Sequence, residues 1–279
     1  MDGDEIQAMI FAAGMGTRLK PLTDRIPKAL VQVGGKPLLE HVILRLKAAG
    51  GSRIVINVHH FANQIINYLS CHDFQMDIRV SDESASLLNT GGGLKKARPF
   101  FNLDSPVLIH NVDVLSNVDL KGFYKTGESC MGGAVQNSSL YMGNGNGEDK
   151  TRNHPVDALL LVSQRKTKRY LVFNDDMRLV GWTNIETGEV KSPYSWVRES
   201  LPKLHLFAFS GIHLFSPRLF PLMDEWPDEF PIMDFYLKNC DKVFIRGYVQ
   251  DHLQLMDVGK QETLAKAEEF LEELKKGQK

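Results

Sequence analysis

A buried strand that runs into a glycine loop is the feature that most constrains the fold of this 279-residue chain. Segment 6–11 (IQAMIF) is almost wholly apolar, and small residues follow it at 12–16 (AAGMG). Such an unbroken apolar run predicts a strand buried on both faces, as in a parallel sheet covered by helices. Its loop would then open at the carboxyl edge of the sheet, where open α/β folds bind ligands.

Strand-like and helix-like segments alternate through the first half of the chain, which predicts a parallel sheet with helical crossovers. In the first predicted helix, apolar residues recur every three or four positions until Gly50 and Gly51, which suit a left-handed helix end. The expected strands are 6–11, 53–58, 76–80 and 106–111. The expected helices are 37–49, 62–69 and 92–98.

The second half is less regular. Segment 127–156 is rich in Gly, Ser and Asn and predicts a mobile surface loop. An amphipathic helix is expected at 261–276, and no repeat or linker is visible, so the chain is expected to form a single domain, 1–279. Short strands, the first three antiparallel, are expected at 158–163, 170–173, 179–182, 207–215, 243–248 and in the stretch that ends at Asp257.

Charge and composition exclude several function classes. The 33 basic and 34 acidic residues give a net charge of -1, which argues against a bulk nucleic-acid binder. The 3 cysteines are widely spaced without a CxxC pattern, which argues against a disulfide framework or a cysteine zinc site. The chain shows no signal peptide and no apolar run of about 18 residues, so no membrane partner is expected. The expected compartment is a reducing cytosol. Nothing in the pattern predicts an oligomeric state.

The loop after the first strand predicts a phosphate-binding site. Successive exposed N–H groups in a glycine turn form an anion-binding concavity, and Arg18 and Lys28 add one fork-shaped and one point-like cation. A tight turn with solvated charges is the structural alternative. The pattern is neither a Walker A loop nor a dinucleotide fingerprint, because Pro37 follows Gly34-Gly35-Lys36 and Leu19 takes the place of the third glycine. The candidate loop residues are Ala12, Ala13, Gly14, Gly16 and Thr17.

Three further elements suggest ligand contacts. The glycines at 91–93 cost about 1 kcal/mol each against Ala in a helix, which predicts close approach to a ligand such as a base. Asp113 and Asp257 end apolar strands, so their carboxylates are expected in the cleft rather than in the core. Two oxygen ligands on separate strands suit Mg²⁺, with a turn or helix-cap role as the alternative. Amides at strand ends can bond hydroxyls, which makes Asn111 and Asn174 candidates for a sugar.

The string 12–23 (AAGMGTRLKPLT) followed by Pro27 and Lys28 resembles the signature of sugar-1-phosphate nucleotidyltransferases. The resemblance implies a Rossmann-like, mixed but mostly parallel α/β sheet with helices on both faces and a small antiparallel extension. It also implies Mg²⁺-dependent joining of a nucleoside triphosphate to a sugar 1-phosphate, with release of pyrophosphate. A nucleotide-binding half at 6–115 would precede a sugar-binding half at 157–260, with 127–156 inserted between them and 261–276 as the terminal helix.

The resemblance also implies roles for single residues. Asp113 and Asp257 would hold the metal, and Gly211 would border the sugar. Glu83 could accept the imino proton of a base, although an acid in a loop is more often solvated. Two positions depart from the family pattern: Val112 could crowd the cleft, and Lys260 could add a cation near the phosphates. The residues that would hold the triphosphate are Gly14, Gly16, Thr17, Arg18 and Lys28. Those beside the base and ribose would be Leu88, Thr90, Gly91 and Gly92.

Several alternatives stay open at this stage. Uridylyl transfer to N-acetylmuramate 1-phosphate fits best among the relatives, with guanylyl transfer to mannose 1-phosphate close behind. A non-catalytic nucleotide-sugar-binding subunit and an oxidoreductase with a degenerate dinucleotide loop are hypotheses from other classes. The basic cluster at 164–169 is expected to be a solvated hairpin, although one of its cations could meet the sugar phosphate. Trp182, Trp196 and Trp226 are expected to pack rather than to stack on a ligand.

Overall fold

The computed structural model describes residues 6–132 and 155–277. Four parallel strands in the order β5-β4-β1-β6 form one half of a ten-stranded sheet, and β12 joins it antiparallel to β6. The chain leaves β1 for β4 on one side and returns to β6 on the other, so the strand order reverses at β1. These strands are β1 (Ile6–Phe11), β4 (Gly51–Val58), β5 (Asp77–Asp82), β6 (Val107–Asn111) and β12 (His205–Phe215).

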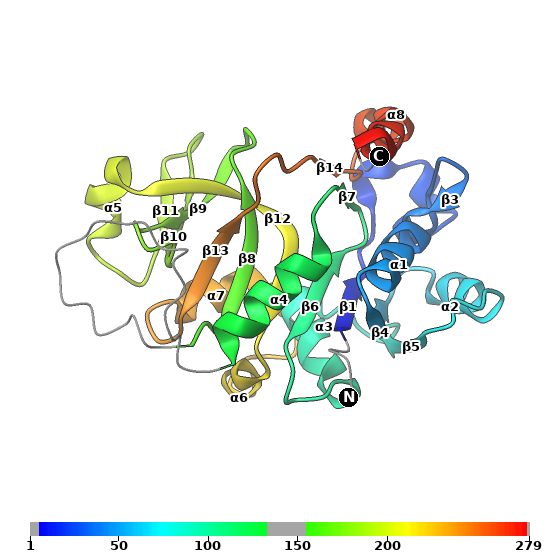
Figure 1. Ribbon diagram of the computed structural model, residues 1–279, viewed down its shortest axis with the longest axis horizontal. Helices are drawn as coiled ribbons and strands as arrows, with labels where there is room; N and C mark the ends of the chain where they lie inside the picture. Colours follow the sequence, from blue (N-terminus) through cyan, green and yellow to red (C-terminus); the bar gives the residue numbers. More distant parts are fainter. Residues whose placement is uncertain (1–5, 133–154, 278–279) are drawn as a thin grey trace.

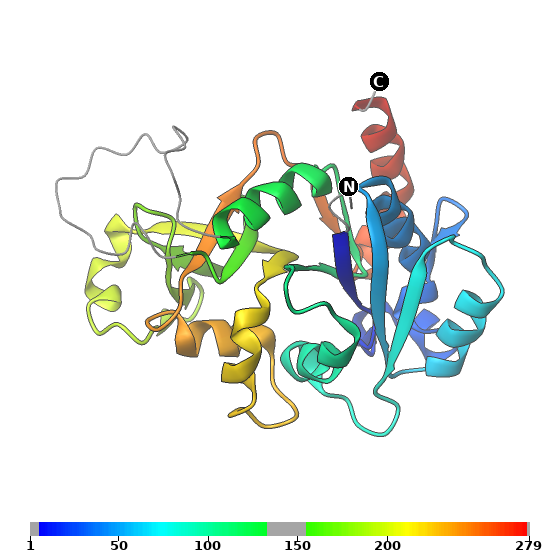
Figure 2. The same ribbon diagram turned by 60° about the horizontal axis from the view of Figure 1, so that its bottom comes forward.

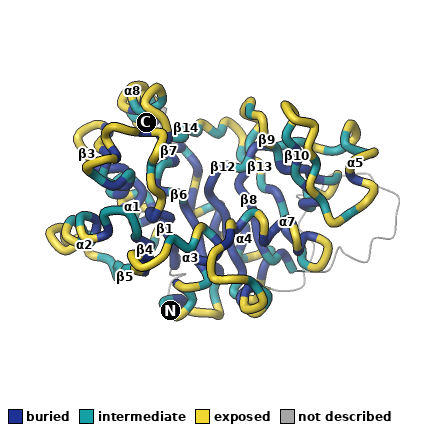
Figure 3. Tube along the Cα trace, turned by 180° about the vertical axis from the view of Figure 1, so that it is seen from behind, coloured by how far each residue is buried: buried dark blue, intermediate teal, exposed yellow. Residues whose placement is uncertain are grey.

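Helices cover both faces of this sheet (Figures 1 and 2). Alternate residues of β1 divide between two apolar clusters: Ala8 and Ile10 pack on one side, Met9 and Phe11 on the other. The first side is covered by α1 (Leu38–Ala48), α2 (Ala62–Ser70), α4 (Leu120–Met131) and α8 (Gln261–Gly277). The second is covered by α3 (Asn89–Ala97), α6 (Phe220–Met223) and α7 (Ile232–Asn239). Figure 3 shows the strands as the buried centre of the molecule and many connecting loops as exposed.

The long strand β12 links two parts of the sheet. Its residues 205–207 pair with β9, and its residues 212–215 pair with β6 and, in part, with β8. The pairing with β8 shifts register between Phe209 and His213, where Gly211 has φ 75°. The strands of this second part are β8 (Ala158–Ser163), β9 (Arg169–Phe173), β10 (Leu179–Asn184), β11 (Glu189–Lys191) and β13 (Ile245–Val249). Three short elements lie outside this sheet: the strands β2 (Gln32–Val33) and β3 (Lys36–Pro37), which pair with each other, and the helix α5 (Val197–Ser200).

A two-stranded ribbon joins the two halves of the chain. Here β7 (Val114–Ser116) follows β6 directly and pairs antiparallel with β14 (Leu255–Asp257). The register sets Asp257 opposite Val114, and the Val258 N–H donates to the Asp113 carbonyl at 2.8 Å. Two aspartates that are 144 positions apart in sequence therefore lie side by side.

Most predicted elements are confirmed, with shifts of a few residues at their ends. The predicted loop 127–156 is wrong at its start, because α4 continues to Met131 and buries Gly127 against the Leu214 side chain. Residues 133–154 of that prediction lie outside the described residues. The helix expected at 92–98 begins at Asn89 instead, and β7, α4 and α7 were not predicted. Within the described parts of the chain, no helix combines the length and apolar character that crossing a membrane requires.

Candidate active site

The loop after β1 is curled at one glycine and open at another. Gly16 has φ 64°, a left-handed conformation, and a Cβ there would lie 2.8 Å from the Thr23 methyl carbon. The Thr23 hydroxyl donates to the Gly16 carbonyl at 2.9 Å and holds the curl. A Cβ at Gly14, by contrast, would meet nothing within 4 Å. The loop is therefore open at Gly14, and ligand binding there stays a prediction.

Arg18, Lys28, Asp113 and Asp257, which were predicted separately, form one cluster. The Lys28 ammonium donates to the Asp113 carboxylate in an ion pair whose two side chains are only 11% and 14% exposed. Gly259 lies at the centre of the cluster. A Cβ on it would stand 2.5 Å from the Asp257 Oδ1, 2.8 Å from an Arg18 guanidinium nitrogen and 3.3 Å from the Lys28 Nζ.

One oxygen of the Asp257 carboxylate lacks a partner, and a cation could supply it. Its Oδ1 is buried and has no hydrogen-bond partner among the described residues. Burial, and then the neighbouring Asp113 carboxylate, raise the pKa of Asp257, while the charges of Lys28 and Arg18 oppose that rise. An orphaned carboxylate oxygen beside a second carboxylate fits the needs of Mg²⁺, which takes one or two carboxylates and completes its shell with substrate oxygens and water. No group of three or more acidic, His or Cys side chains that could hold a metal ion occurs in the described parts of the chain.

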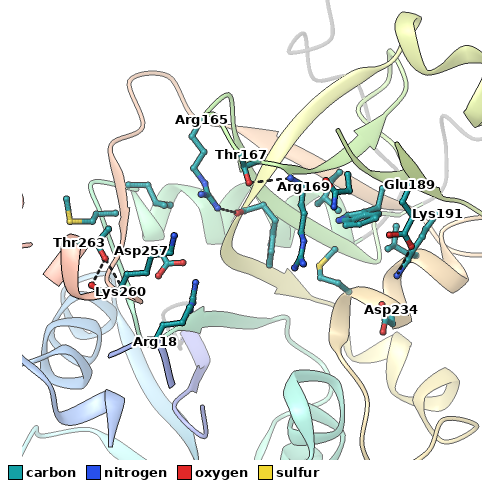
Figure 4. Close-up of a pocket in the computed structure, with 18 residues that line it drawn as sticks. Arg18, Arg165, Thr167, Arg169, Glu189, Lys191, Asp234, Asp257, Lys260 and Thr263 are labelled. Atoms are coloured by element: carbon teal, nitrogen blue, oxygen red, sulfur yellow. Dashed lines mark hydrogen bonds and ion pairs between the residues drawn. The ribbon is translucent and has the colours of Figure 1, made fainter. Parts of the chain in front are cut away.

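A pocket of about 890 Å³ extends from this cluster into the second half of the molecule (Figure 4). Arg18, Asp257 and Lys260 line one end of it. The other end is lined by alternate residues of three neighbouring strands, which therefore share one face of the sheet. These residues are Arg169 and Leu171 of β9, Trp182 and Asn184 of β10, and Glu189 and Lys191 of β11. Met233, Asp234 and Leu237 of α7 line the pocket as well.

The glycines of α3 pack closely against the segment that precedes α7, rather than facing open space. A Cβ at Gly91 would stand 2.3 Å from the Phe230 ring, and one at Gly92 would stand 1.9 Å from the Asp228 carbonyl oxygen. The Gly91 N–H donates to the Phe230 carbonyl at 2.8 Å, and the Ile232 N–H donates to the Thr90 hydroxyl at 2.9 Å. The Leu88 carbonyl accepts from Phe230. The explanation that a base demands these glycines is thus unnecessary, because the segment that enters α7 already occupies the space.

Glu83 is buried rather than solvated, which corrects the expectation for an acid in a loop. Its side chain accepts from the Asn57 Nδ2 at 2.8 Å and from the Leu88 N–H at 3.3 Å, and burial raises its pKa. The Asn57 Oδ1 in turn accepts from the Ala12 N–H at 2.8 Å. This relay connects the end of β1 with the loop that precedes α3. The sequence signal for this relay is Asn57, a polar residue within the apolar strand 53–58.

The candidate sugar residues separate into two groups. A Cβ at Gly211 would stand 2.7 Å from the Asn111 Nδ2, so these two candidates lie together, at the end of β6. Asn174 lies elsewhere: its Oδ1 accepts from the Arg178 N–H at 2.9 Å and closes the turn between β9 and β10. It follows Phe173, at the end of β9 opposite to the pocket-lining Arg169. The structure therefore does not bring Asn174 to the pocket.

Four other expectations concern the same pocket. The cluster 164–169 is only partly a solvated hairpin, since Arg165 and Arg169 line the pocket while Lys168 pairs with Glu186 at 2.7 Å. Trp182 packs against the second apolar cluster as expected, and it also lines the pocket. Lys260 lines the pocket as expected of an added cation. Val112 is buried in the apolar cluster and does not crowd the cleft.

Comparison with known proteins confirms the resemblance. The family model described as nucleotidyl transferase matches residues 7–130. An N-acetylmuramate alpha-1-phosphate uridylyltransferase of Caulobacter vibrioides is 43% identical over 109 residues, which are 38% of this chain and 45% of that protein. A mannose-1-phosphate guanyltransferase of Aspergillus oryzae is 33% identical over 118 residues, which are 42% of this chain and 32% of that protein. The chain thus spans about half the length, or less, of these curated relatives.

The fold comparison extends over nearly the whole chain. The crystal structure of HddC from Yersinia pseudotuberculosis superposes with a TM-score of 0.67, covering 95% of this chain and 99% of that one at 21% identity. Identity at this level shows a common fold. The α/β sheet with helices on both faces is therefore the fold of this solved relative, and residues 7–130 match the nucleotidyl transferase family.

Proposed function

We propose that this protein is an enzyme that transfers a nucleotidyl group from a nucleoside triphosphate to a sugar 1-phosphate and releases pyrophosphate. The observation that carries the proposal is the convergence of Arg18, Lys28 and Asp257 around Gly259, at one end of a large pocket. Asp113 joins this cluster through its ion pair with Lys28. The family match of residues 7–130 supports the same chemistry. The curated relatives favour UTP and N-acetylmuramate 1-phosphate as substrates, with GTP and mannose 1-phosphate as the second candidates.

The proposed reaction is an in-line displacement. A phosphate oxygen of the sugar 1-phosphate forms a bond to the α-phosphorus, and the bond from that phosphorus to the bridging oxygen breaks, so that pyrophosphate carries away the electron pair. The attacking oxygen is already anionic, so the step requires no general base. The residues act by positioning and charge stabilisation, the main contributions to phosphoryl-type transfer.

Each member of the cluster has a role in this proposal. Arg18 and Lys28 neutralise the departing pyrophosphate, with a guanidinium fork and a point charge respectively. Asp113 and Asp257 would hold Mg²⁺, whose charge would offset the mutual repulsion of the two phosphates. The Gly14 loop offers backbone N–H groups to the triphosphate. A purely nucleotide-sugar-binding protein would not need two carboxylates at the place where two anions meet.

Release of pyrophosphate from the purified protein tests this proposal, across a panel of nucleoside triphosphates and sugar 1-phosphates with and without Mg²⁺. We expect turnover with one triphosphate and dependence on Mg²⁺. Asp257→Asn should lower kcat about a thousandfold, because metal stabilisation contributes several kcal/mol, while the melting temperature is retained. Asp176→Asn is the matched control and should turn over normally. Asp176 is exposed in the turn that follows β9, at the end of that strand opposite to the pocket-lining Arg169. Absence of pyrophosphate release with every pair, or normal turnover by Asp257→Asn, would refute the proposal.

A further inference from the structure

The far end of the pocket carries donor groups that the proposed chemistry does not use. In the sheet register, Arg169 of β9 lies beside Asn184 of β10, which lies beside Glu189 of β11. All three belong to the pocket lining. Figure 4 shows Arg169 pointing into the pocket, between the end with Arg18 and Asp257 and the side that carries Lys191.

Most of the other charged groups at this end already have partners. Lys191 lies 3.7 Å from the Glu189 carboxylate and 5.2 Å from the centre of the Trp182 ring. The Arg165 guanidinium donates to the Phe209 carbonyl at 3.0 Å. Arg169 differs, because its guanidinium has no hydrogen-bond, ion-pair or ring partner among the described residues.

Asn184 presents a donor to the same space. Its Oδ1 accepts from the Glu186 N–H at 3.0 Å, which leaves the Nδ2 as the group available to a ligand. Its Nδ2 has no acceptor in the described parts of the chain. A guanidinium fork and an amide N–H₂ on adjacent strands can bind both oxygens of one carboxylate.

We propose that the far end of the pocket binds a carboxylate substituent of the sugar, so that the acceptor is an acidic sugar 1-phosphate held at both ends. This inference rests on the proposed function. The 1-phosphate must reach the cluster at Asp257, so the Arg169 site serves a second group. A single unpaired guanidinium with Asp234 also in the lining suits a singly charged carboxylate better than a second phosphate. Trp182 and Met233 add the apolar surface that the faces of a sugar ring pack against.

A matched pair of acceptors tests the inference. N-acetylmuramate 1-phosphate carries a carboxylate on a side chain of the sugar, and N-acetylglucosamine 1-phosphate is the same sugar without it. We expect wild-type KM to be at least about tenfold lower for the first, as one charge-assisted hydrogen-bond pair allows. Arg169→Gln and Asn184→Asp should each remove most of that difference and leave kcat and the KM for the triphosphate within about twofold. Neither variant should change the KM for the acceptor that lacks the carboxylate. Arg169→Lys should restore part of the preference.

Lys168→Gln is the control, since Lys168 precedes Arg169 but pairs with Glu186 outside the pocket lining. Equal KM values for the two acceptors in the wild type, or equal effects of Arg169→Gln on both, would overturn the inference while leaving nucleotidyl transfer intact. If no acceptor gives pyrophosphate, the proposed function fails, and calorimetric binding of the two sugar phosphates to the same variants still decides the carboxylate site. Equal binding by wild type and Arg169→Gln would then overturn it.

Discussion

Gly259, in the middle of the charged cluster, has no room for a side chain, and its sequence neighbours give no sign of this constraint. Gly259 follows the predicted metal ligand by two positions and has no chemistry of its own. Its absent side chain is what lets Asp257, Arg18 and Lys28 approach one another, because a Cβ would come within 2.5 Å of the Asp257 carboxylate oxygen. The sequence marks the position only as a glycine, so its role is visible in the structure alone.

Gly259→Ala should therefore inactivate the protein without unfolding it. The added methyl group must displace the Asp257 carboxylate or the Arg18 guanidinium, and a displacement of about 1 Å can cost about a hundredfold in rate. We expect kcat for pyrophosphate release to fall by about that factor. The melting temperature should change by only a few degrees, because the nearest atoms to the methyl group are the ends of flexible side chains rather than backbone. Wild-type kcat in Gly259→Ala would show that the cluster tolerates the displacement and is not the reaction centre.

At the scale of elements, the two acidic ligands depend on the β7–β14 ribbon, and a half-buried arginine of α1 binds one end of that ribbon. Arg45 of α1 donates to the Ser116 hydroxyl at 3.0 Å and to the Val118 carbonyl at 2.6 Å. Burial lowers the pKa of Arg45 to about 10, so the guanidinium remains charged at neutral pH. The contact fixes the end of β7, whose other end begins directly after Asp113.

Arg45→Leu should loosen the ribbon and weaken metal binding. Removing the guanidinium leaves a buried hydroxyl and a carbonyl without a donor, which costs about 2 kcal/mol of unfolding free energy. We expect a lower urea midpoint and a several-fold rise in the Mg²⁺ concentration for half-maximal turnover. Lys47→Leu on the same helix is the control, since Lys47 donates to Phe74 and Gln75 rather than to the ribbon. Equal Mg²⁺ dependence in the two variants would rule out this role for Arg45.

The success of sequence reasoning also varies by element. Strand β1, helix α1 and the two aspartates at strand ends could be predicted, because apolar periodicity and a polar residue after an apolar run are local signals. Helix α7 was not, because its eight residues follow three prolines and several aromatic residues that obscure the spacing of Ile232, Phe235 and Tyr236. That helix supplies one wall of the pocket and the segment against Gly91. The meaning of the glycine run follows from such long-range packing and has no local signal. The contact between Glu83 and Asn57 has one local signal, the polar residue at 57 within an apolar strand.

At the scale of the whole molecule, one polar side chain of β12, His213, is buried against the second apolar cluster. His213 is 1% exposed, and neither of its ring nitrogens has a hydrogen-bond partner among the described residues. It packs among the rings of Phe11, Phe209 and Tyr236, and the Tyr236 hydroxyl is likewise unpartnered. Burial lowers the pKa of His213 from 6.5 to about 3. The imidazole is therefore neutral in the folded protein down to strongly acidic pH.

This histidine should make the stability of the entire fold depend on pH. The unfolded chain takes up a proton at residue 213 as the pH falls through about 6.5, whereas the folded chain does not, so stability is full above that pH and falls below it. Between pH 7.5 and pH 5.0 the loss from this residue amounts to about 2 kcal/mol. His213→Phe keeps an aromatic ring among aromatic neighbours and removes the titrating group. Urea unfolding at the two pH values should show a smaller loss for His213→Phe than for the wild type, by about that amount. An equal loss in both proteins would mean that His213 is protonated in the fold or titrates alike in both states, and that acid sensitivity arises elsewhere. His205→Phe, at an exposed position near the start of the same strand, is the control and should leave the wild-type dependence nearly unchanged.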